Sequence, residues 1–351
     1  MQIALIGWQA GGKSTLFTSL TGLEPAYGEE AFPGMVEIPD DTLDRLHELW
    51  PVAKKIPAKV QYLDVAGLAH EEKRSGFKRS MTNHLQNAGV LCPVFGAFQE
   101  SGSTEEVAEM MRALIEDLET ELLLSDMQIA ESRAEKIASS KQRGIKVDAA
   151  EDRAITKVLD ALNEETPLRL IELGAEEEKA IRSYAFLTLK PLLIVVNKGE
   201  EQDGEALQAA LSDVEGDLKR LIVLDAQVEA EIAGLPEEDR GDFLEDMGIE
   251  SPASERLLQE SFYLLGLIRF FTVGDDEVRS WPIRKGTPAV EAAGEIHSDL
   301  QRGFIRAEVV PSADLLELGS MSACRDKGLL RLEGKTYEVR DGDVMHVRFA
   351  V

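Results

Sequence analysis

A glycine-rich segment near the beginning of the chain constrains the fold more than any other feature. Residues 7–15 read GWQAGGKST, which satisfies the pattern G-x-x-x-x-G-K-[ST]. An apolar run at residues 3–6 precedes the segment, and a helical pattern begins at Thr15. In this order, glycines let backbone N–H groups and the N-terminus of the helix face a phosphate chain. The segment therefore predicts a phosphate-binding loop between a strand and a helix.

Two side chains of this loop carry the predicted chemistry. Lys13 is expected to reach the β- and γ-phosphates of a nucleotide, and the hydroxyl of Ser14 is expected to bind Mg²⁺. The other nucleotide contacts are predicted to come from the rest of the loop, at Gly7, Ala10, Gly11, Gly12 and Thr15. The loop as a whole predicts a nucleotide site.

A short acidic motif ends the next predicted strand. The strand at residues 60–63 is followed by Asp64-Val65-Ala66-Gly67. A carboxylate at Asp64 can hold Mg²⁺ through water, and the N–H of Gly67 can contact a γ-phosphate. Because this motif comes one strand after a phosphate loop, it favours a switch-type NTPase over a small-molecule kinase.

A third motif predicts where the base of the nucleotide binds. Asn197, Lys198 and Glu200 follow a buried apolar run at residues 192–196. Guanine-specific NTPases carry N-K-x-D at this place, and Glu200 is one methylene longer than the Asp that pairs with guanine. The base preference is therefore predicted to move toward adenine. Guanine recognition by a repositioned Glu200 is the alternative.

Lys198 and two residues after the next apolar run complete the predicted base site. Lys198 is expected to form an aliphatic floor under the base. Asp225 and Ala226 follow the apolar run at residues 221–224, where a loop along the base edge is expected. The base site therefore draws on the ends of two predicted strands.

The apolar runs indicate an α/β domain with a mostly parallel sheet. Runs without polar alternation are typical of strands that are buried on both faces, and they lie at residues 3–6, 60–63, 90–94, 192–196 and 221–224. Between the third and fourth runs, apolar residues recur at helical spacing on both sides of a break near Gly144. This pattern predicts an antiparallel helical hairpin at residues 117–184, either a solvated helix pair or a docking arm.

From about residue 269 the pattern changes to short alternating segments separated by glycine turns. Such alternation predicts a small, mostly antiparallel sheet and a second fold over residues 269–351. This part carries 12 basic and 14 acidic residues, whereas the whole chain has a net charge of −27. The nearly neutral C-terminal part is therefore the part expected to approach RNA.

Composition excludes several other classes of protein. The positive charge is too diluted for general binding to DNA or other polyanions. Cys92 and Cys324 lie far apart and form no zinc motif. No run approaches the ~20 apolar residues that a membrane span needs. We therefore expect a reduced, cytoplasmic chain with neither a membrane nor DNA as a partner.

The motifs together resemble the Obg-like ATPase (YchF) family of P-loop NTPases. The phosphate loop, the segment at residues 64–68, the helical insertion and Glu200 all match the family pattern. The most specific matches lie in the C-terminal part, at residues 270–274, 277–281, 284–287, 292–297, 303–308 and 341–346. The resemblance covers the whole length of the chain.

This resemblance implies a domain plan and an activity. A G domain would occupy residues 1–116 and 185–268, with a coiled-coil hairpin at 117–184 between its two parts. Residues 269–351 would form a TGS domain, which is a ubiquitin-like β-grasp module. The resemblance also implies binding of Mg²⁺ and of ATP in preference to GTP, and association with the ribosome or ribosomal RNA through the TGS domain.

Three departures from the family pattern bear on hydrolysis. Family loops usually carry Asn at the position of Ala10, where it is linked to potassium-assisted hydrolysis. Residues 22–35 contain no Ser or Thr to bind Mg²⁺. The segment at 69–75 replaces a glycine-rich stretch, and its His70 is a candidate for orienting the attacking water, although a solvated loop histidine is the favoured interpretation. A slow ATPase switch, a nucleotide-binding adaptor without turnover and a GTPase all remain open.

Overall fold

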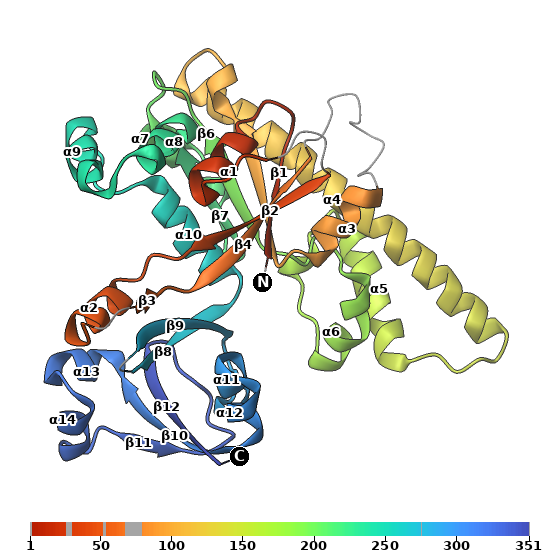
Figure 1. The fold of residues 1–351 in the computed structure, drawn as a ribbon. Helices are drawn as coiled ribbons and strands as arrows, with labels where there is room; N and C mark the ends of the chain where they lie inside the picture. The colour runs from red at the N-terminus through yellow and green to blue at the C-terminus, as the bar shows by residue number, and fades with distance from the viewer. Residues whose placement is uncertain (1, 26–29, 52–53, 67–78, 275, 351) are drawn as a thin grey trace. The chain divides into compact units, whose positions relative to one another are not determined.

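The computed structural model describes residues 2–25, 30–51, 54–66, 79–274 and 276–350 (Figure 1). Its contacts divide the chain into two compact units. The first unit comprises Met1–Gly34 and Gln61–Leu257, and the second comprises Met35–Val60 and Leu258–Val351.

The first unit contains the predicted parallel sheet. Its strand order is β2-β4-β1-β5-β6-β7, and the pairs β4–β1, β1–β5, β5–β6 and β6–β7 are all parallel. The strands are β1 (Gln2–Ile6), β2 (Ala31–Glu37), β4 (Lys59–Val65), β5 (Val90–Gly96), β6 (Leu192–Asn197) and β7 (Lys219–Leu224). Every residue of β6 is buried, as its unbroken apolar pattern predicts.

Helices cover this sheet and extend it into an arm. They are α1 (Lys13–Thr21), α3 (Arg79–Asn87), α4 (Thr104–Gln142), α5 (Ala149–Asn163), α6 (Ala175–Ile181), α7 (Gly204–Ala210), α8 (Ala226–Gly234) and α9 (Glu237–Met247). α10 (Ala253–Leu264) carries the chain from the first unit into the second. None of the helices in the described ranges combines the length and the apolar character of a membrane span.

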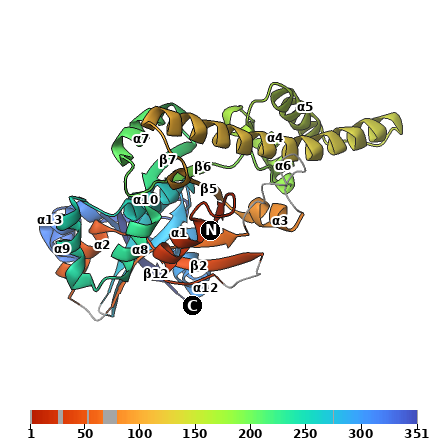
Figure 2. The same ribbon diagram turned by 90° about the horizontal axis from the view of Figure 1, so that it is seen from above.

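The predicted helical hairpin is confirmed, with a longer first helix than expected. α4 ends at Gln142 and α5 begins at Ala149, on either side of Gly144. Both views show α5 and α6 beside the outer half of α4 (Figures 1 and 2). The inner half of α4 packs on the sheet through Met111, Ile115 and other apolar residues. One uninterrupted helix therefore passes through the predicted boundary at residue 117.

A buried aspartate fastens the arm to the chain that enters β6. Asp126 of α4 is fully buried, and its carboxylate accepts hydrogen bonds from the N–H of Leu187 (2.8 Å) and the N–H of Thr188 (2.7 Å). The hydroxyl of Thr188 donates a third, at 2.6 Å. These bonds satisfy backbone groups that a buried turn would otherwise leave unpaired.

Lys190 lies beside this clamp and gives stability a specific pH dependence. Its ammonium donates to the carbonyl oxygens of Gln86 (2.9 Å) and Ala88. Burial lowers the pKa of Lys190 to about 8, and the nearby charge of Asp126 opposes this shift. The unfolded chain therefore binds a proton that the folded chain lacks between about pH 8 and 10.5.

Between about pH 8 and 10.5, the contribution of Lys190 to the free energy of unfolding is therefore predicted to rise with pH. The rise is up to ~1.4 kcal/mol per pH unit. The contribution is lost as the pH falls through the pKa of Lys190 in the folded chain. Urea unfolding of the wild-type and Lys190→Met chains at several pH values measures it. The stability difference is expected to shift in favour of the wild type as the pH rises. A difference that is the same at every pH would contradict the assignment.

The second unit contains a smaller mixed sheet. Its strand order is β11-β10-β12-β8-β9-β3; β8 and β12 pair in parallel at its centre, whereas β10 pairs antiparallel with both β11 and β12. The strands are β3 (Lys54–Ile56), β8 (Leu267–Val273), β9 (Glu277–Arg284), β10 (Phe304–Pro311), β11 (Arg331–Glu333) and β12 (Asp343–Phe349). A sheet whose first and last long strands run parallel at its centre, with a helix across it, is the β-grasp arrangement.

Helices pack on both faces of this sheet. α11 (Ala289–Ile296) and α12 (Ser298–Arg302) cover a core that includes Phe270, whereas α2 (Asp41–Leu49), α13 (Ser312–Leu318) and α14 (Met321–Asp326) cover one that includes Phe271. Phe270 and Phe271 point to opposite faces because side chains alternate along a strand. The predicted C-terminal fold is thus present.

One segment lies outside the unit in which the predicted domain plan placed it. Residues 35–60, assigned to the first part of the G domain, group with the C-terminal residues instead. The reason is pairing and capping: β3 pairs with β9, and Asp40 caps α2 while it accepts a hydrogen bond from Ser280 at 3.2 Å. Asp40 also lies 3.4 Å from Arg269. These contacts join parts of the chain that are far apart in sequence.

Candidate nucleotide-binding site

The predicted phosphate loop connects β1 to α1 and passes close to neighbouring backbone. Gly12 has a φ of 87° and immediately precedes Lys13, the first residue of α1. A Cβ at Gly12 would lie 2.0 Å from Nδ2 of Asn197, and one at Gly7 would lie 2.4 Å from the carbonyl oxygen of Val94. Both positions therefore require glycine, as the loop pattern predicts.

Ala10 occupies a strained position in the same loop. Its φ of 64° is in the left-handed region, which alanine rarely adopts. The side chain of Gln99 donates a hydrogen bond to the carbonyl oxygen of Ala10 at 2.7 Å and so holds the loop in this conformation. The rest of the structure thus compensates for a strain of ~1–3 kcal/mol.

The structure brings the three residues with predicted phosphate and metal roles together. Lys13 forms an ion pair with Asp64, and the Ser14 hydroxyl donates to the other carboxylate oxygen at 3.0 Å. Lys13 and Asp64 are each only 7% exposed. The parallel register, which pairs Leu5 with Asp64, sets the end of β4 beside the loop. A cation and a carboxylate are thus poised at the helix N-terminus.

A cavity of about 470 Å³ continues from the loop to the predicted base site. Seven of the predicted residues line it, namely Gly12, Thr15, Asn197, Lys198, Glu200, Asp225 and Ala226. The amide of Asn197 links both sides of this site, because it donates to the carbonyl oxygen of Gly11 at 3.3 Å and accepts from the N–H of Ala226 at 2.8 Å. The cavity therefore has the continuity that a nucleotide requires.

Two residues of this cavity have features that the sequence motifs do not indicate. Phe98, which the motifs do not single out, lines the cavity and is 44% exposed. The sequence feature that could have identified Phe98 is an aromatic residue soon after the end of a central strand. The carboxylate of Asp225 caps α8 by accepting from the N–H groups of Gln227 (3.0 Å) and Val228 (3.3 Å), so that it is engaged along the cavity wall.

The predicted γ-phosphate and catalytic positions lie outside the described residues. These are Gly67 and His70, together with the rest of the segment at 69–75. Residues 26–29 of the segment at 22–35 are also outside the described ranges. The roles expected for these positions remain predictions.

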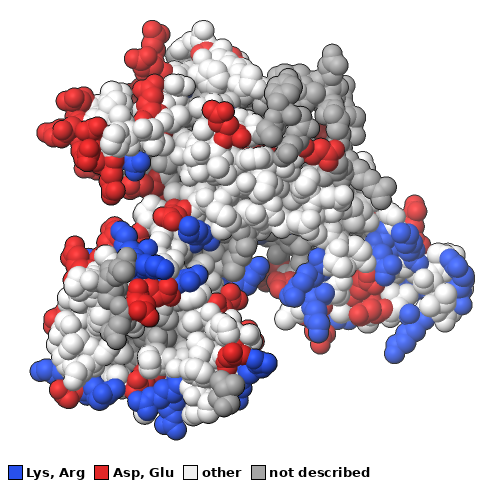
Figure 3. Space-filling view, viewed as in Figure 1, with Lys and Arg blue, Asp and Glu red and all other residues white. Residues whose placement is uncertain are grey.

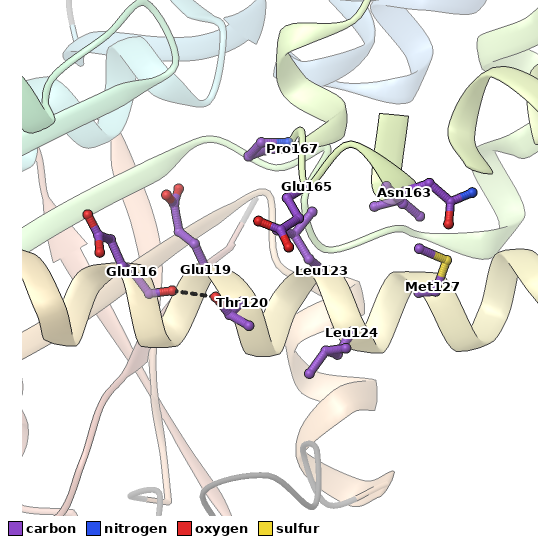
Figure 4. A pocket seen from close by; sticks show the side chains of 10 residues that line it. Glu116, Glu119, Thr120, Leu123, Leu124, Met127, Asn163, Glu165 and Pro167 are labelled. Atoms are coloured by element: carbon purple, nitrogen blue, oxygen red, sulfur yellow. Dashed lines mark hydrogen bonds between the residues drawn. The ribbon is translucent and has the colours of Figure 1, made fainter. Parts of the chain in front are cut away.

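A second cavity, of about 530 Å³, lies on the arm and does not suit a nucleotide (Figure 4). Glu116, Glu119 and Glu165 point into or along it, among Leu123, Met127 and other residues. Carboxylates repel a polyphosphate, and none of the described residues that line this cavity is a glycine whose loop could supply backbone N–H groups. The cavity beside Gly12 is therefore the nucleotide candidate.

Comparison with known proteins identifies relatives that match the full length of this chain. The chain is 36% identical over 362 residues to the ribosome-binding ATPase YchF of Bacillus subtilis, a match that covers 99% of this chain and 98% of that protein. The chain belongs to the YchF family. The ribosome-binding ATPase YchF of Escherichia coli O157:H7 is 34% identical over 361 residues, with 99% and 98% of the two chains covered.

The fold of this YchF-family chain also matches a solved structure. The YchF GTPase of Schizosaccharomyces pombe superposes with a TM-score of 0.83 at 25% identity, over 99% of this chain and 97% of that one. A family model described as "50S ribosome-binding GTPase" matches residues 2–128, and a YchF C-terminal model described as "Protein of unknown function (DUF933)" matches residues 267–350. The predicted family and the predicted fold class are confirmed.

Proposed function

We propose that this YchF-family chain binds ATP with Mg²⁺ beside the phosphate loop, hydrolyses ATP slowly and associates with the ribosome. The observation that carries the proposal is the convergence of Lys13, Ser14 and Asp64 next to Gly12 and Thr15, which line the same cavity as Asn197 and Glu200. The loop side of this cavity suits a phosphate chain, and the side with Asn197 and Glu200 suits a base.

The donor set beside the loop fits Mg²⁺. A hydroxyl at Ser14 and a carboxylate at Asp64 are hard oxygen donors, which this ion prefers. When bound, Mg²⁺ would neutralise charge on the phosphates. The ammonium of Lys13 pairs with Asp64, and the phosphates of a nucleotide offer it an alternative partner. Nucleotide binding therefore exchanges one buried ion pair for another.

ATP is proposed over GTP because of the side chain at the base end of the cavity. Glu200 is exposed at the cavity edge, one methylene longer than the Asp that reads guanine. Phe98 and the aliphatic part of Lys198 line the same cavity and offer apolar surface that any purine accepts. Similar proteins include both a ribosome-binding ATPase and a GTPase, and calorimetry distinguishes the two bases.

Calorimetric titration with ATP, GTP and their diphosphates tests this choice. We expect the wild-type chain to bind ATP more tightly than GTP, and Glu200→Asp to shift the ratio toward GTP by about tenfold, the effect of one recovered hydrogen-bonded pair. Glu201→Asp, a neighbouring exposed position, is the matched control and is expected to leave the ratio unchanged. Tighter GTP binding by the wild type would contradict the proposal.

A non-hydrolysing adaptor is the second candidate function. It is favoured by the absence of Ser and Thr from residues 22–35 and by Ala10 in the loop, where no side-chain oxygen is present. Single-turnover measurements with labelled ATP distinguish the two functions. Phosphate release faster than the uncatalysed reaction supports the slow ATPase, and release at the uncatalysed rate supports the adaptor.

Ribosome association is proposed because the relatives from Bacillus subtilis and Escherichia coli O157:H7 are ribosome-binding ATPases. The match to those proteins covers the full chain, including the C-terminal unit. Co-sedimentation of the purified chain with ribosomes, in the presence of ATP and without it, tests the association. We expect the C-terminal β-grasp unit to carry the RNA contact, because it is nearly neutral on an acidic chain.

A further inference from the structure

Two arginines lie directly opposite each other at exposed positions on the second sheet. In the antiparallel pairing of β10 with β12, Arg306 is the register partner of Arg348, and both residues are exposed. Like charges at directly opposed positions destabilise a sheet by ~0.2–1 kcal/mol. Because both side chains are at the surface, packing of the core does not account for them. A negatively charged ligand would.

More positive charge gathers on the same face. Glu308 is the register partner of His346 on one side and of Leu332 on the other, two residues from Arg306 along β10. Alternate residues of a strand share a face. Glu308 is 6% exposed and accepts from Arg348 and, at 3.3 Å, from Arg325 of α14. Two of the three arginines thus pair with one buried carboxylate, and Arg306 shares their face, which leaves an excess of two positive charges.

The three arginines are held to different degrees. Glu308 anchors Arg325 and Arg348, so their guanidinium groups are oriented before any ligand arrives. Within the described part of the chain, Arg306 has no hydrogen bond or ion pair. A guanidinium that is exposed, opposed by a like charge and unpaired is available to an anion.

Apolar and aromatic surface accompanies this charge. Leu332 is 54% exposed, and His346 is exposed on the other side of Glu308 on the same face, while Ile305 near the start of β10 is 53% exposed. Figure 3 shows Lys and Arg side chains along the lower border of the second unit, where Figure 1 shows β10 and β11. By contrast, acidic side chains crowd over α9 of the first unit. The basic surface is therefore local.

We infer that this arginine face, defined by Arg306, Arg325, Arg348, His346 and Leu332, binds a single strand of RNA through its phosphates. Guanidinium groups bind phosphate oxygens with charge-assisted hydrogen bonds, and the opposed pair loses its repulsion when phosphates lie between or above it. His346 and Leu332 offer surfaces on which unstacked bases rest. The choice of RNA over DNA rests on the proposed ribosome association, whereas the surface is independent of the nucleotide site.

Fluorescence anisotropy of the full-length chain with a labelled, mixed-sequence single-stranded RNA tests the arginine face. Arg306→Gln is expected to raise the RNA dissociation constant about tenfold. It should also reduce the slope of log K against log salt by ~0.7. The free energy of unfolding should stay the same or rise, because the opposed pair is relieved. That readout excludes loss of folding as the cause of weaker binding.

Two further variants sharpen the comparison. Arg302→Gln removes the same charge from an exposed position on α12, where Arg302 pairs with Asp299, and it is expected to leave RNA binding unchanged. Arg306→Lys keeps the charge and is expected to keep the wild-type salt slope. Equal dissociation constants for Arg306→Gln and Arg302→Gln would overturn the proposal. So would polyglutamate displacing labelled RNA as well as unlabelled RNA does.

Failure of this surface and failure of the proposed function give different results. A Lys13→Ala chain without nucleotide is expected to bind the RNA as the wild type does, because Lys13 belongs to the other unit. A wild-type chain that does not sediment with ribosomes, but binds RNA in an Arg306-dependent way, would contradict the ribosome association and support the arginine face.

Discussion

Lys13→Ala is expected to weaken ATP binding by about 100-fold or more, because it removes the ammonium that would make charge-assisted hydrogen bonds to two phosphates. Hydrolysis should fall below detection for the same reason. Titration calorimetry measures the first effect and labelled phosphate release measures the second. Lys13 is the first residue of α1, directly after the predicted phosphate loop, and it pairs there with Asp64.

The control for this variant addresses both charge and folding. Lys141→Ala removes the same charge from an exposed ion pair near the end of α4 and is expected to leave ATP binding unchanged. Because Lys13→Ala leaves Asp64 buried without its cation, a Lys13→Ala/Asp64→Asn chain should recover stability but not ATP binding. ATP binding by Lys13→Ala with the wild-type dissociation constant would exclude the proposed nucleotide site.

Asp126→Ala is expected to produce the largest loss of stability, about 3–5 kcal/mol in the free energy of unfolding. The substitution leaves two backbone N–H groups and the Thr188 hydroxyl without the acceptor that they share. Asp126→Asn keeps one acceptor oxygen and is expected to lose about half as much. Urea unfolding followed by circular dichroism measures both.

Glu131→Ala is the matched control for Asp126. Glu131 lies on the same helix at an exposed position, so its removal is expected to change the free energy of unfolding by less than ~0.5 kcal/mol. An Asp126→Ala chain as stable as the Glu131→Ala chain would show that the clamp between α4 and the chain before β6 contributes little.

Local patterns were sufficient for the parts of the fold that bury one continuous surface. The strand β6 is apolar at nearly every position because helices or strands cover both its faces, and its pattern shows this directly. The phosphate loop could also be predicted from the sequence, because the close approaches of neighbouring atoms at Gly7 and Gly12 leave room only for glycine. The hairpin could be predicted because its two apolar stripes are separated by a break near Gly144.

Other features depend on contacts between distant parts of the chain, which no local pattern reports. Residues 35–60 are drawn into the second unit by the pairing of β3 with β9 and by the bonds of Asp40. Phe98 reaches the nucleotide cavity because β5 ends beside the phosphate loop. The cap made by Asp225 depends on where α8 begins, a boundary that sequence patterns locate poorly.

The unbroken course of α4 makes the arm a stiff lever. At 1.5 Å per residue, the part of α4 beyond Asp126 extends ~24 Å from its fixed point, so a tilt of ~5° there carries the tip by ~2 Å. The same rod begins in the core of the sheet, where Met111 and Ile115 are packed. Any small rearrangement of that core therefore produces a larger displacement at the far end of the arm, because the continuous helix has no hinge that could absorb it.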